Sequence, residues 1–298
     1  MSDEESFPEG AVVAGVDGSE KDLRVLDWAA EEAGRRGAGL HVLSAVPLFT
    51  GTTYYDVMPT QELQDSARRI ARAGAEHVRA AHPGLEVTSQ VLRMDPASAL
   101  VHASERASVV VVGARGLGRI AGRILGSVSQ KVAAHAHSPV VMVRDLAPAP
   151  DGPVVVGVDP DHVSPEVMRF AFAQAQQRGA GVRIVHGGAR PQFRPELQDP
   201  RIDVLLDSVA ENRATEVQRT AEEWSERYPG VPVDVRVVPR HPVEALAEAA
   251  ATASLLVVGS RTRGGLANVR LGSVSRGVLH EAPVVAVVRV GHEPGRTT

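Results

Sequence analysis

The sequence predicts an α/β protein with two tandem doubly wound domains, each a parallel sheet covered by helices on both faces. Aliphatic runs alternate with helical patterns five times in the first half of the 298 residues. Parallel strands need crossover connections, which helices supply. The pattern then restarts: PVVVGVDP at 153–160 repeats AVVAGVDG at 11–18. The chain length also suits two domains of about 150 residues.

Composition fits a globular protein and argues against several other classes. Hydrophobic residues make up 43% of the chain and charged residues 23%, which indicates neither disorder nor a membrane protein. A net charge of -4 argues against a general nucleic-acid binder, and the lack of cysteine excludes disulfides and cysteine-ligated metals. The acidic start MSDEESFPEG is unlike a signal peptide, and no apolar run approaches a membrane span. We therefore expect a cytoplasmic protein without a membrane partner.

The elements of the first domain follow from local patterns. We expect residues 1–10 to be a disordered lead-in, and the strand after it to stop at Asp17-Gly18, with Ser19 capping a helix over 19–36. Asp95 before Pro96 predicts an N-cap and a first-turn proline for a helix through 107. The other expected elements are strands at 40–46, 85–92, 109–112 and 139–144, a loop at 47–59, and helices over 63–78 and from 126.

The second domain repeats the first. The predicted boundaries are 11–145 for domain 1, a proline-rich linker at 146–152, 153–290 for domain 2, and a tail at 291–298. The repeats match at a spacing of 142 residues near the first strands and 146 residues at the glycine loops. Four net residues therefore entered the second copy, and we place them in 191–207. Helical spacing of Val217, Ala221 and Trp224 predicts the next helix, and 283–288 the last strand.

A glycine- and arginine-rich loop follows the fourth strand of each domain. In an open parallel sheet the ligand crevice lies beyond the carboxyl ends of the strands, where the strand order reverses. If strands one and four are neighbours, Asp17 and Gly113 face one crevice. A carboxylate suits ribose hydroxyls, glycines let the main chain approach phosphates, and Gly126-Ser127 adds the amides of a helix N-terminus. This combination indicates a nucleotide site.

Other polar residues near the loop have simpler explanations. Arg115, Arg119 and Arg123 add positive charge but are more simply solvated than bound to a ligand. His135 and His137 lie two residues apart on a helix, so they point to different faces, which argues against a metal pair.

The loop resembles that of a known family. Gly113 and Gly116, then nine residues and GSVS at 126–129, after a first strand ending GVDGS, closely resemble the ATP-binding universal stress protein family. The resemblance covers both domains and implies a five-stranded sheet of order 3-2-1-4-5 in each. It implies ATP as ligand, with or without Mg2+, and cAMP or AMP as alternatives. The implied roles are Asp17 on the ribose, Val42 near the adenine, Gly113, Gly116 and Gly126 on the phosphates, and Ser127, Val128 and Ser129 at the terminal phosphates.

The second copy departs from this pattern. The equivalent residues are Asp159, Ile184, Gly259, Gly272, Ser273, Val274 and Ser275. However, Thr262 stands in place of the second glycine, and Pro160-Asp161 follow Asp159 where the first copy has Gly18-Ser19. Threonine is strained where φ must be positive and bulky where the chain passes a phosphate, and Asp161 would repel phosphates. We expect this site to bind nucleotide weakly or not at all.

Three functions remain open. The first is a nucleotide-binding regulatory protein of the stress response without turnover, which the lack of an evident base, nucleophile or metal cluster favours. The second is an enzyme that hydrolyses ATP or phosphorylates itself at Ser127 or Ser129, although SGG-type, HIGH-type and Walker A strings are absent. The third is an interaction module without nucleotide.

The resemblance also has an implication for partners. It implies that two domains pair through their last strands, here 139–144 and 283–288, which would cover edges that otherwise invite aggregation. We therefore expect an internal pseudo-dimer of the two domains, with a further homodimer as an additional possibility.

Overall fold

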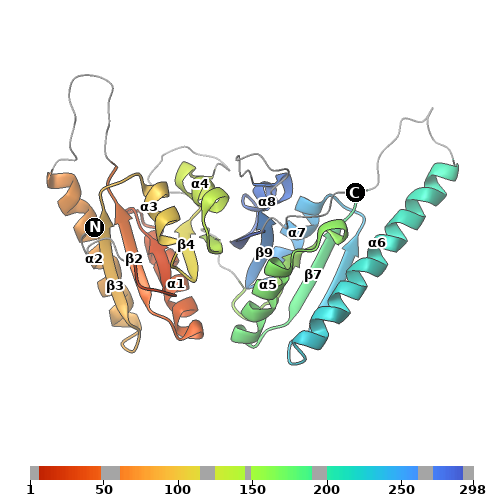
Figure 1. Cartoon of the computed structure of the whole chain (residues 1–298), viewed down its shortest axis with the longest axis horizontal. Helices are drawn as coiled ribbons and strands as arrows, with labels where there is room; N and C mark the ends of the chain where they lie inside the picture. Colours follow the sequence, from red (N-terminus) through yellow and green to blue (C-terminus); the bar gives the residue numbers. More distant parts are fainter. Residues whose placement is uncertain are drawn as a thin grey trace, which may run out of the picture. The chain divides into compact units, whose positions relative to one another are not determined.

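The computed structural model describes residues 7–47, 61–114, 125–144, 149–189, 200–260 and 271–290. Contacts divide the chain into two compact units, with the boundary between residues 146 and 147. Each unit has a parallel sheet with helices packed on its strands (Figure 1). The predicted α/β fold class is therefore confirmed. The predicted loop at 47–59 lies, apart from Pro47, outside the described residues.

Unit 1 has the strand order β3-β2-β1-β4-β5, and every neighbouring pair is parallel. Its elements in chain order are β1 (Val12–Gly15), α1 (Asp22–Arg36), β2 (Leu40–Ala45), α2 (Gln61–Ala81), β3 (Val87–Leu92), α3 (Pro96–Ala103), β4 (Val109–Gly113), α4 (Ser127–His135) and β5 (Val140–Val143).

Unit 2 repeats this arrangement with the order β8-β7-β6-β9-β10. Its elements are β6 (Val154–Gly157), the short 3-10 helix η2 (Pro160–His162), α5 (Pro165–Arg178), β7 (Val182–Gly187), α6 (Pro200–Arg227), β8 (Val233–Val238), α7 (Pro242–Ala250), β9 (Leu255–Ser260), α8 (Ser273–Val278) and β10 (Val284–Arg289).

The central strands are aliphatic because both faces of the sheet are covered. Side chains alternate between the two faces of a strand. On one face of unit 1, a Cβ placed on Gly74 of α2 would lie 3.5 Å from Val42 of β2 and 3.0 Å from Leu26 of α1. On the other face, a Cβ placed on Gly15 of β1 would lie 3.0 Å from Leu100 of α3. Val42 itself is fully buried.

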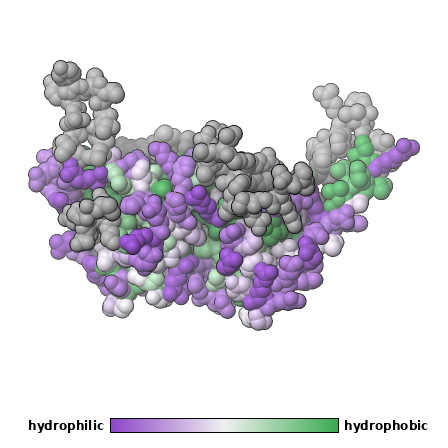
Figure 2. Space-filling model, viewed as in Figure 1, coloured by the Kyte–Doolittle hydropathy of each residue, from purple (hydrophilic) through white to green (hydrophobic). Residues whose placement is uncertain are grey.

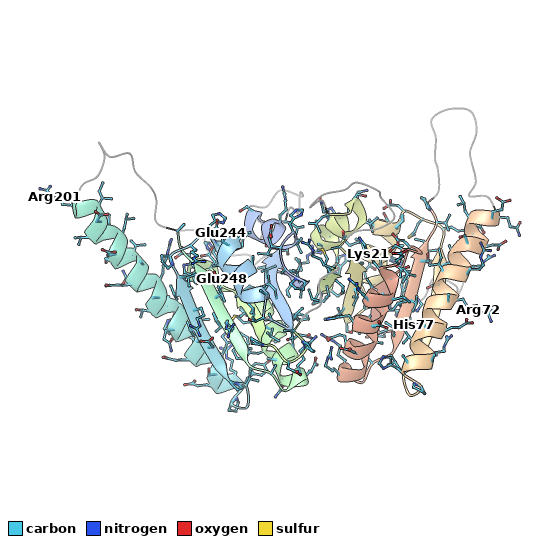
Figure 3. The ribbon with its side chains drawn as sticks, turned by 180° about the vertical axis from the view of Figure 1, so that it is seen from behind. Lys21, Arg72, His77, Arg201, Glu244 and Glu248 are labelled. Atoms are coloured by element: carbon cyan, nitrogen blue, oxygen red, sulfur yellow. The ribbon has the colours of Figure 1, made fainter. Side chains whose placement is uncertain are left out.

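The helix ends agree with the sequence in part. Asp95 caps α3 as predicted, since its carboxylate accepts the Ser98 N–H at 3.1 Å. That helix ends at Ala103 and not at residue 107, because the chain turns at Ser104, whose hydroxyl donates to the Val101 carbonyl. The prediction that Ser19 caps α1 is wrong. The N-cap position is Lys21, without a side-chain cap (Figure 3).

Charged side chains also connect helices within unit 1. His77 of α2 lies 2.7 Å from Asp27 of α1, and both are substantially exposed (Figure 3). Because exposed pairs contribute little to stability, this contact adds less to the packing of α1 on α2 than the buried apolar residues do.

Helix α6 is longer than its counterpart, with 28 residues against 21 in α2. Its start falls within the predicted insertion at 191–207, so the later part of that segment is helical. Val204 and Leu205 near this start are 70% and 63% exposed, and an apolar patch is visible there in Figure 2. Farther along, Trp224 packs against Phe172 at 5.7 Å between ring centroids, as expected for a packing residue.

A buried carboxylate in α1 gives a test of the repeat. Glu32 is fully buried and lies 2.6 Å from Arg36, while unit 2 has the neutral Gln174, also fully buried, bonded to Arg178. Glu32→Ala should lower the free energy of unfolding by about 2 kcal/mol, because it removes a buried carboxylate that pairs with the guanidinium groups of Arg35 and Arg36. Glu32→Gln should lower the free energy of unfolding by less than about 1 kcal/mol, because unit 2 already has a buried glutamine at the equivalent position.

Urea-induced unfolding measures both changes. The matched control is Glu31→Ala, which removes an exposed partner of Arg35 and should change stability by less than about 0.5 kcal/mol. A loss for Glu31→Ala as large as that for Glu32→Ala would contradict the argument from burial.

Candidate functional site

The pairing of β1 with β4 places the first two candidate residues at adjacent strand ends. Val12 pairs with Val109 and Ala14 with Val111, both strands running in the same direction. Asp17 follows β1 by two residues, and Gly113 is the last residue of β4. Both therefore lie at the carboxyl edge of the sheet. The adjacency that the crevice argument requires is present in unit 1.

A tight turn holds the main chain around Asp17. The Asp22 carboxylate, in the first turn of α1, accepts the N–H of Gly18 at 2.7 Å and that of Asp17 at 3.1 Å. The carboxylate of Asp17 in turn accepts the Ser19 N–H at 3.1 Å. Gly18 has φ of +87°, a conformation that side chains disfavour. The turn therefore depends on one glycine and two aspartates.

Asp22 is a residue of this site that the sequence reasoning missed. The pKa of Asp22 is raised from the ordinary 3.8 to about 6, mainly by burial and also by the nearby Asp17 charge, while the N–H groups of Gly18 and Asp17 act in the opposite direction. The signal in the sequence is a second acid, five residues after Asp17, in the first turn of a helix. That position is commonly acidic because of the helix dipole, so the acid alone did not indicate a site.

The two ends of the glycine loop are fastened to each other. The Gly126 N–H donates to the Ala114 carbonyl at 2.9 Å, and the Ala114 N–H donates to Val143 of β5 at 3.0 Å. The Ser129 hydroxyl lies 3.2 Å from the Ala114 carbonyl and 3.0 Å from that of Gly126. These contacts bring the start of α4 to the carboxyl end of β4, beside the turn after β1.

Ser129 has a structural role in the loop that the sequence did not predict. Its side chain is 3% exposed and its hydroxyl is directed to main-chain carbonyls. In the described structure this hydroxyl holds the loop ends together, and the expectation that it binds terminal phosphates stays a prediction. Ser127, in contrast, is exposed.

The start of α4 can bind an anion. Gly126 is the N-cap, with φ of -64° and ψ of 145°, and the Gln130 N–H is bonded back to its carbonyl at 3.1 Å. The amides of Ser127, Val128 and Ser129 come before that first helical bond, in the turn where N–H groups lack intrahelical partners. The positive end of the helix dipole lies at the same place.

The residues expected near the adenine are core residues. Val42 and Ile184 are fully buried in the middle of β2 and β7, and the Val42 side chain faces α2. Both side chains are enclosed by packing, and the expectation that these residues lie near an adenine stays a prediction. At the carboxyl edge of β2 lie Ala45, which is partly exposed, and Val46, which is buried.

Several predicted residues cannot be placed. Gly116, Arg115, Arg119, Arg123 and Thr262 lie outside the described residues. The expected effects of Gly116 and Thr262 on phosphate binding remain predictions.

Unit 2 has the same strand adjacency, with Val154 of β6 paired to Leu255 of β9. Gly259 lies in β9, and the Ser275 hydroxyl donates to its carbonyl at 2.7 Å. Gly272 is the N-cap of α8, so Ser273, Val274 and Ser275 form its first turn. Ser275 is 5% exposed and is therefore a loop fastener like Ser129.

The turn after β6 differs from its counterpart. Asp159 is the N-cap of η2, and its carboxylate accepts the Asp161 N–H at 3.3 Å. Asp161, which was expected to repel phosphates, lies 3.2 Å from Arg213 of α6, so its charge is partly neutralised. Helix α8 has six residues against nine in α4, which gives it a smaller dipole.

The comparison with known families settles the classification. The model of the universal stress protein family matches residues 10–144 and again residues 152–289. The chain belongs to this family. It carries two universal stress protein domains in tandem, as the glycine loops indicated.

Two relatives match this chain over nearly the whole length of both proteins. Universal stress protein Rv2005c of Mycobacterium tuberculosis is 34% identical over 289 residues, covering 93% of this chain and 96% of that protein. Universal stress protein Rv1996 of the same organism is 33% identical over 312 residues, covering 95% and 96%. The crystal structure of a universal stress protein from Archaeoglobus fulgidus has a TM-score of 0.66 at 22% identity, covering 96% and 98%, and shows the same fold.

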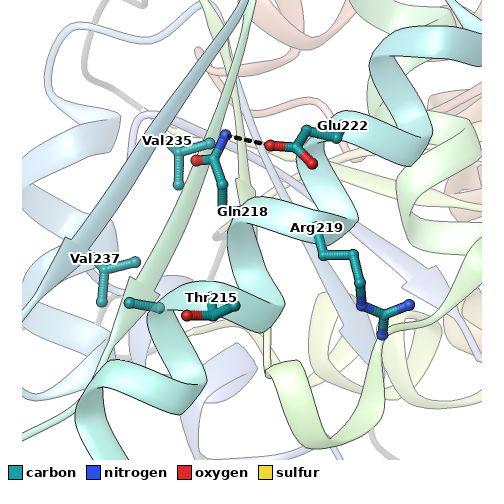
Figure 4. A pocket seen from close by; sticks show the side chains of 7 residues that line it. Thr215, Gln218, Arg219, Glu222, Val235 and Val237 are labelled. Atoms are coloured by element: carbon teal, nitrogen blue, oxygen red, sulfur yellow. Dashed lines mark hydrogen bonds between the residues drawn. The ribbon is translucent and has the colours of Figure 1, made fainter.

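A separate groove lies away from the universal stress protein loops. It has a volume of about 690 Å³ and is lined by residues of α6 and β8, including Gln218, Glu222 and Val235 (Figure 4). The Gln218 amide donates to Glu222 at 3.2 Å. Strand β8 is the far edge of the unit 2 sheet from β9 and β10, so this groove is distinct from the crevice beside Asp159.

Two kinds of feature are absent from the described residues. Within those ranges, no three or more histidine, aspartate or glutamate side chains are arranged to hold a metal ion. Across the same part of the chain, none of the helices combines the length and the apolar character that crossing a membrane requires.

The assignment of Ser129 as a structural residue can be tested without ligand. Ser129→Ala should lower the free energy of unfolding by about 1 kcal/mol, because a buried hydroxyl loses its bonds to two carbonyls. Ser127→Ala, at an exposed position of the same helix, should leave stability within about 0.5 kcal/mol. Urea-induced unfolding of the ligand-free protein measures both, and the reverse ranking would restore a ligand role for Ser129.

Proposed function

We propose that unit 1 binds an adenine nucleotide, with ATP as the first choice, and that the protein acts as a regulator in the stress response. The observation that carries the proposal is the convergence of the Asp17 turn and the start of α4 at neighbouring strand ends of one sheet. The first element offers a carboxylate and the second offers amides.

The chemistry of these two elements fits the two ends of a nucleotide. The Asp17 carboxylate accepts hydrogen bonds from ribose hydroxyls. The amides at the start of α4, with the exposed Ser127 hydroxyl, donate to phosphate oxygens, and the helix dipole adds about 0.3 to 2 kcal/mol per anionic group. Membership of the universal stress protein family supports the same assignment. AMP and cAMP satisfy the same donors and acceptors, and Mg2+ would be brought with ATP by its phosphates.

Unit 2 supports weaker binding. Its aspartate caps a 3-10 helix, whereas Asp17 lies in the turn held by Asp22, and its final helix is shorter. We therefore propose that unit 1 is the main nucleotide site and that unit 2 binds weakly or not at all.

A regulatory role without turnover is the simplest function for such a site. The described part of the unit 1 crevice offers a sugar acceptor and phosphate donors, and nothing in its hydrogen bonding activates a water or a hydroxyl for attack on a phosphate. Nucleotide occupancy would stabilise unit 1 by mass action, by about 2.7 kcal/mol at a concentration one hundred times the dissociation constant. That change in stability is a signal that partner proteins can detect.

Calorimetric titration with ATP tests the proposal. We expect tight binding near one ATP per chain, abolished by Asp17→Ala and by Gly126→Val. Because Gly126 has negative φ, valine is not strained there, so lost binding would report bulk beside the phosphates. Asp159→Ala is the matched control in unit 2 and should retain the tight site. Undetectable binding to the wild type would sink the proposal.

The enzyme alternative has its own readout. Multiple turnovers of ATP to ADP that disappear in Asp17→Ala would replace the regulatory proposal with a catalytic one. Phosphate incorporation into the protein, lost in Ser127→Ala, would indicate autophosphorylation instead.

A further inference from the structure

We propose that Asp22 is a positioning residue of the nucleotide site: it holds the turn after β1 in the shape that presents the Asp17 carboxylate to the ribose. The inference rests on the proposed nucleotide function of unit 1 and adds to it the residue that makes Asp17 competent.

The geometry places Asp22 underneath the turn. Its carboxylate accepts the N–H groups of Asp17 and Gly18, at 3.1 and 2.7 Å, and lies 3.4 Å from the Ser19 hydroxyl. All three residues of the turn are thus bonded to one side chain. The Asp17 carboxylate, bonded to the Ser19 N–H, is oriented by the same turn.

The turn needs a side chain that fixes its shape, because its central residue has a backbone conformation that most amino acids disfavour. Gly18 has φ of +87°, and a Cβ at this position would lie 2.8 Å from the Ile70 side chain of α2. The flexible glycine fits the space but does not by itself fix the direction of the chain. The hydrogen bonds that the Asp22 carboxylate accepts restrict the direction of the chain.

Stability does not account for the carboxylate at this position. The charged group that faces Asp22 in the turn is Asp17, and α2 contributes the apolar Ile70. Because the pKa of Asp22 is raised to about 6 from 3.8, the folded state holds this proton more tightly than the unfolded state does. The group favours folding at low pH, and that contribution is lost as the pH rises through 3.8 to 6. At neutral pH the burial of the Asp22 carboxylate therefore opposes folding, so a gain in stability does not explain the acid at this position.

Unit 2 shows what the fold does without this residue. Ser164 occupies the position equivalent to Asp22 and caps α5, accepting the Val167 N–H at 3.3 Å. Without a carboxylate beneath it, the chain after β6 forms η2, and Asp159 is bonded to the Asp161 N–H. The fold thus tolerates loss of the acid, while the turn that presents the first aspartate changes.

Binding of two nucleotides by the full chain tests the inference. Asp22→Ala should weaken ATP binding by about tenfold or more, because the turn loses bonds to a charged acceptor. Asp22→Asn should stay within about threefold of the wild type, since its amide oxygen accepts the same two N–H groups. Asp27→Asn, an exposed acid on the same helix, is the matched charge control and should bind as the wild type does.

The second ligand separates positioning from general damage. 2′,3′-Dideoxy-ATP lacks the ribose hydroxyls, so Asp17 has nothing to bind and Asp22→Ala should leave its weaker affinity unchanged. Equal weakening of ATP and dideoxy-ATP by Asp22→Ala would overturn the inference, as would unchanged ATP binding in that variant. Either result leaves the proposed function standing if the wild type binds ATP.

Two ligand-free measurements keep the inference testable if the wild type binds no ATP. Amide hydrogen exchange at Asp17 and Gly18 should be at least about tenfold faster in Asp22→Ala and near the wild-type rate in Asp22→Asn. Equal exchange in all three proteins would overturn it.

The pH dependence of stability is the second of these. Relative to Asp22→Asn, the free energy of unfolding of the wild type should fall as the pH rises from 4 to 7, because only the wild type loses the Asp22 proton. Parallel profiles would show that this carboxyl does not lie beneath the turn as the structure has it.

Discussion

The pairing of β1 with β4 is the constraint on which the rest of unit 1 depends. It reverses the direction in which strands are added to the sheet, so the helices that follow the two strands pack on opposite faces, and ligands of such sheets bind at the carboxyl edge between them. Asp17 and the loop ends at Ala114 and Gly126 lie at that edge. The same pairing in β6 and β9 gives unit 2 the same frame.

The two units keep the frame and differ in what they attach to it. In both, a buried serine, Ser129 or Ser275, bonds to a main-chain carbonyl at the end of the fourth strand. The turn after the first strand has diverged, from one held by Asp22 to one built on η2. The fold is thus maintained by one set of residues and the site by another.

The sequence predicted what depends on periodicity and on single strong signals. Alternation of strands and helices gave the fold class, and Asp95 was a correct cap. The sequence did not predict structural roles that depend on the direction in which a side chain points. Ser129 belongs to the family pattern but faces inward, and Val42 follows the expected strand but packs on α2. Asp22 was missed because only the folded turn shows that three residues converge on it.

The contact between Gly18 and Ile70 links two parts of the chain that lie far apart in sequence. In unit 2 the corresponding positions hold Pro160 and Glu216, and Glu216 pairs with Arg219 on its own exposed helix face. Proline cannot adopt the positive φ of Gly18. Both the glycine and the isoleucine are therefore replaced in the second repeat. A chimera that receives the first-strand turn of the other unit without the helix that faces it would combine a turn and a helix from different repeats. The smallest segment that can be exchanged between the units therefore includes both the turn and the helix.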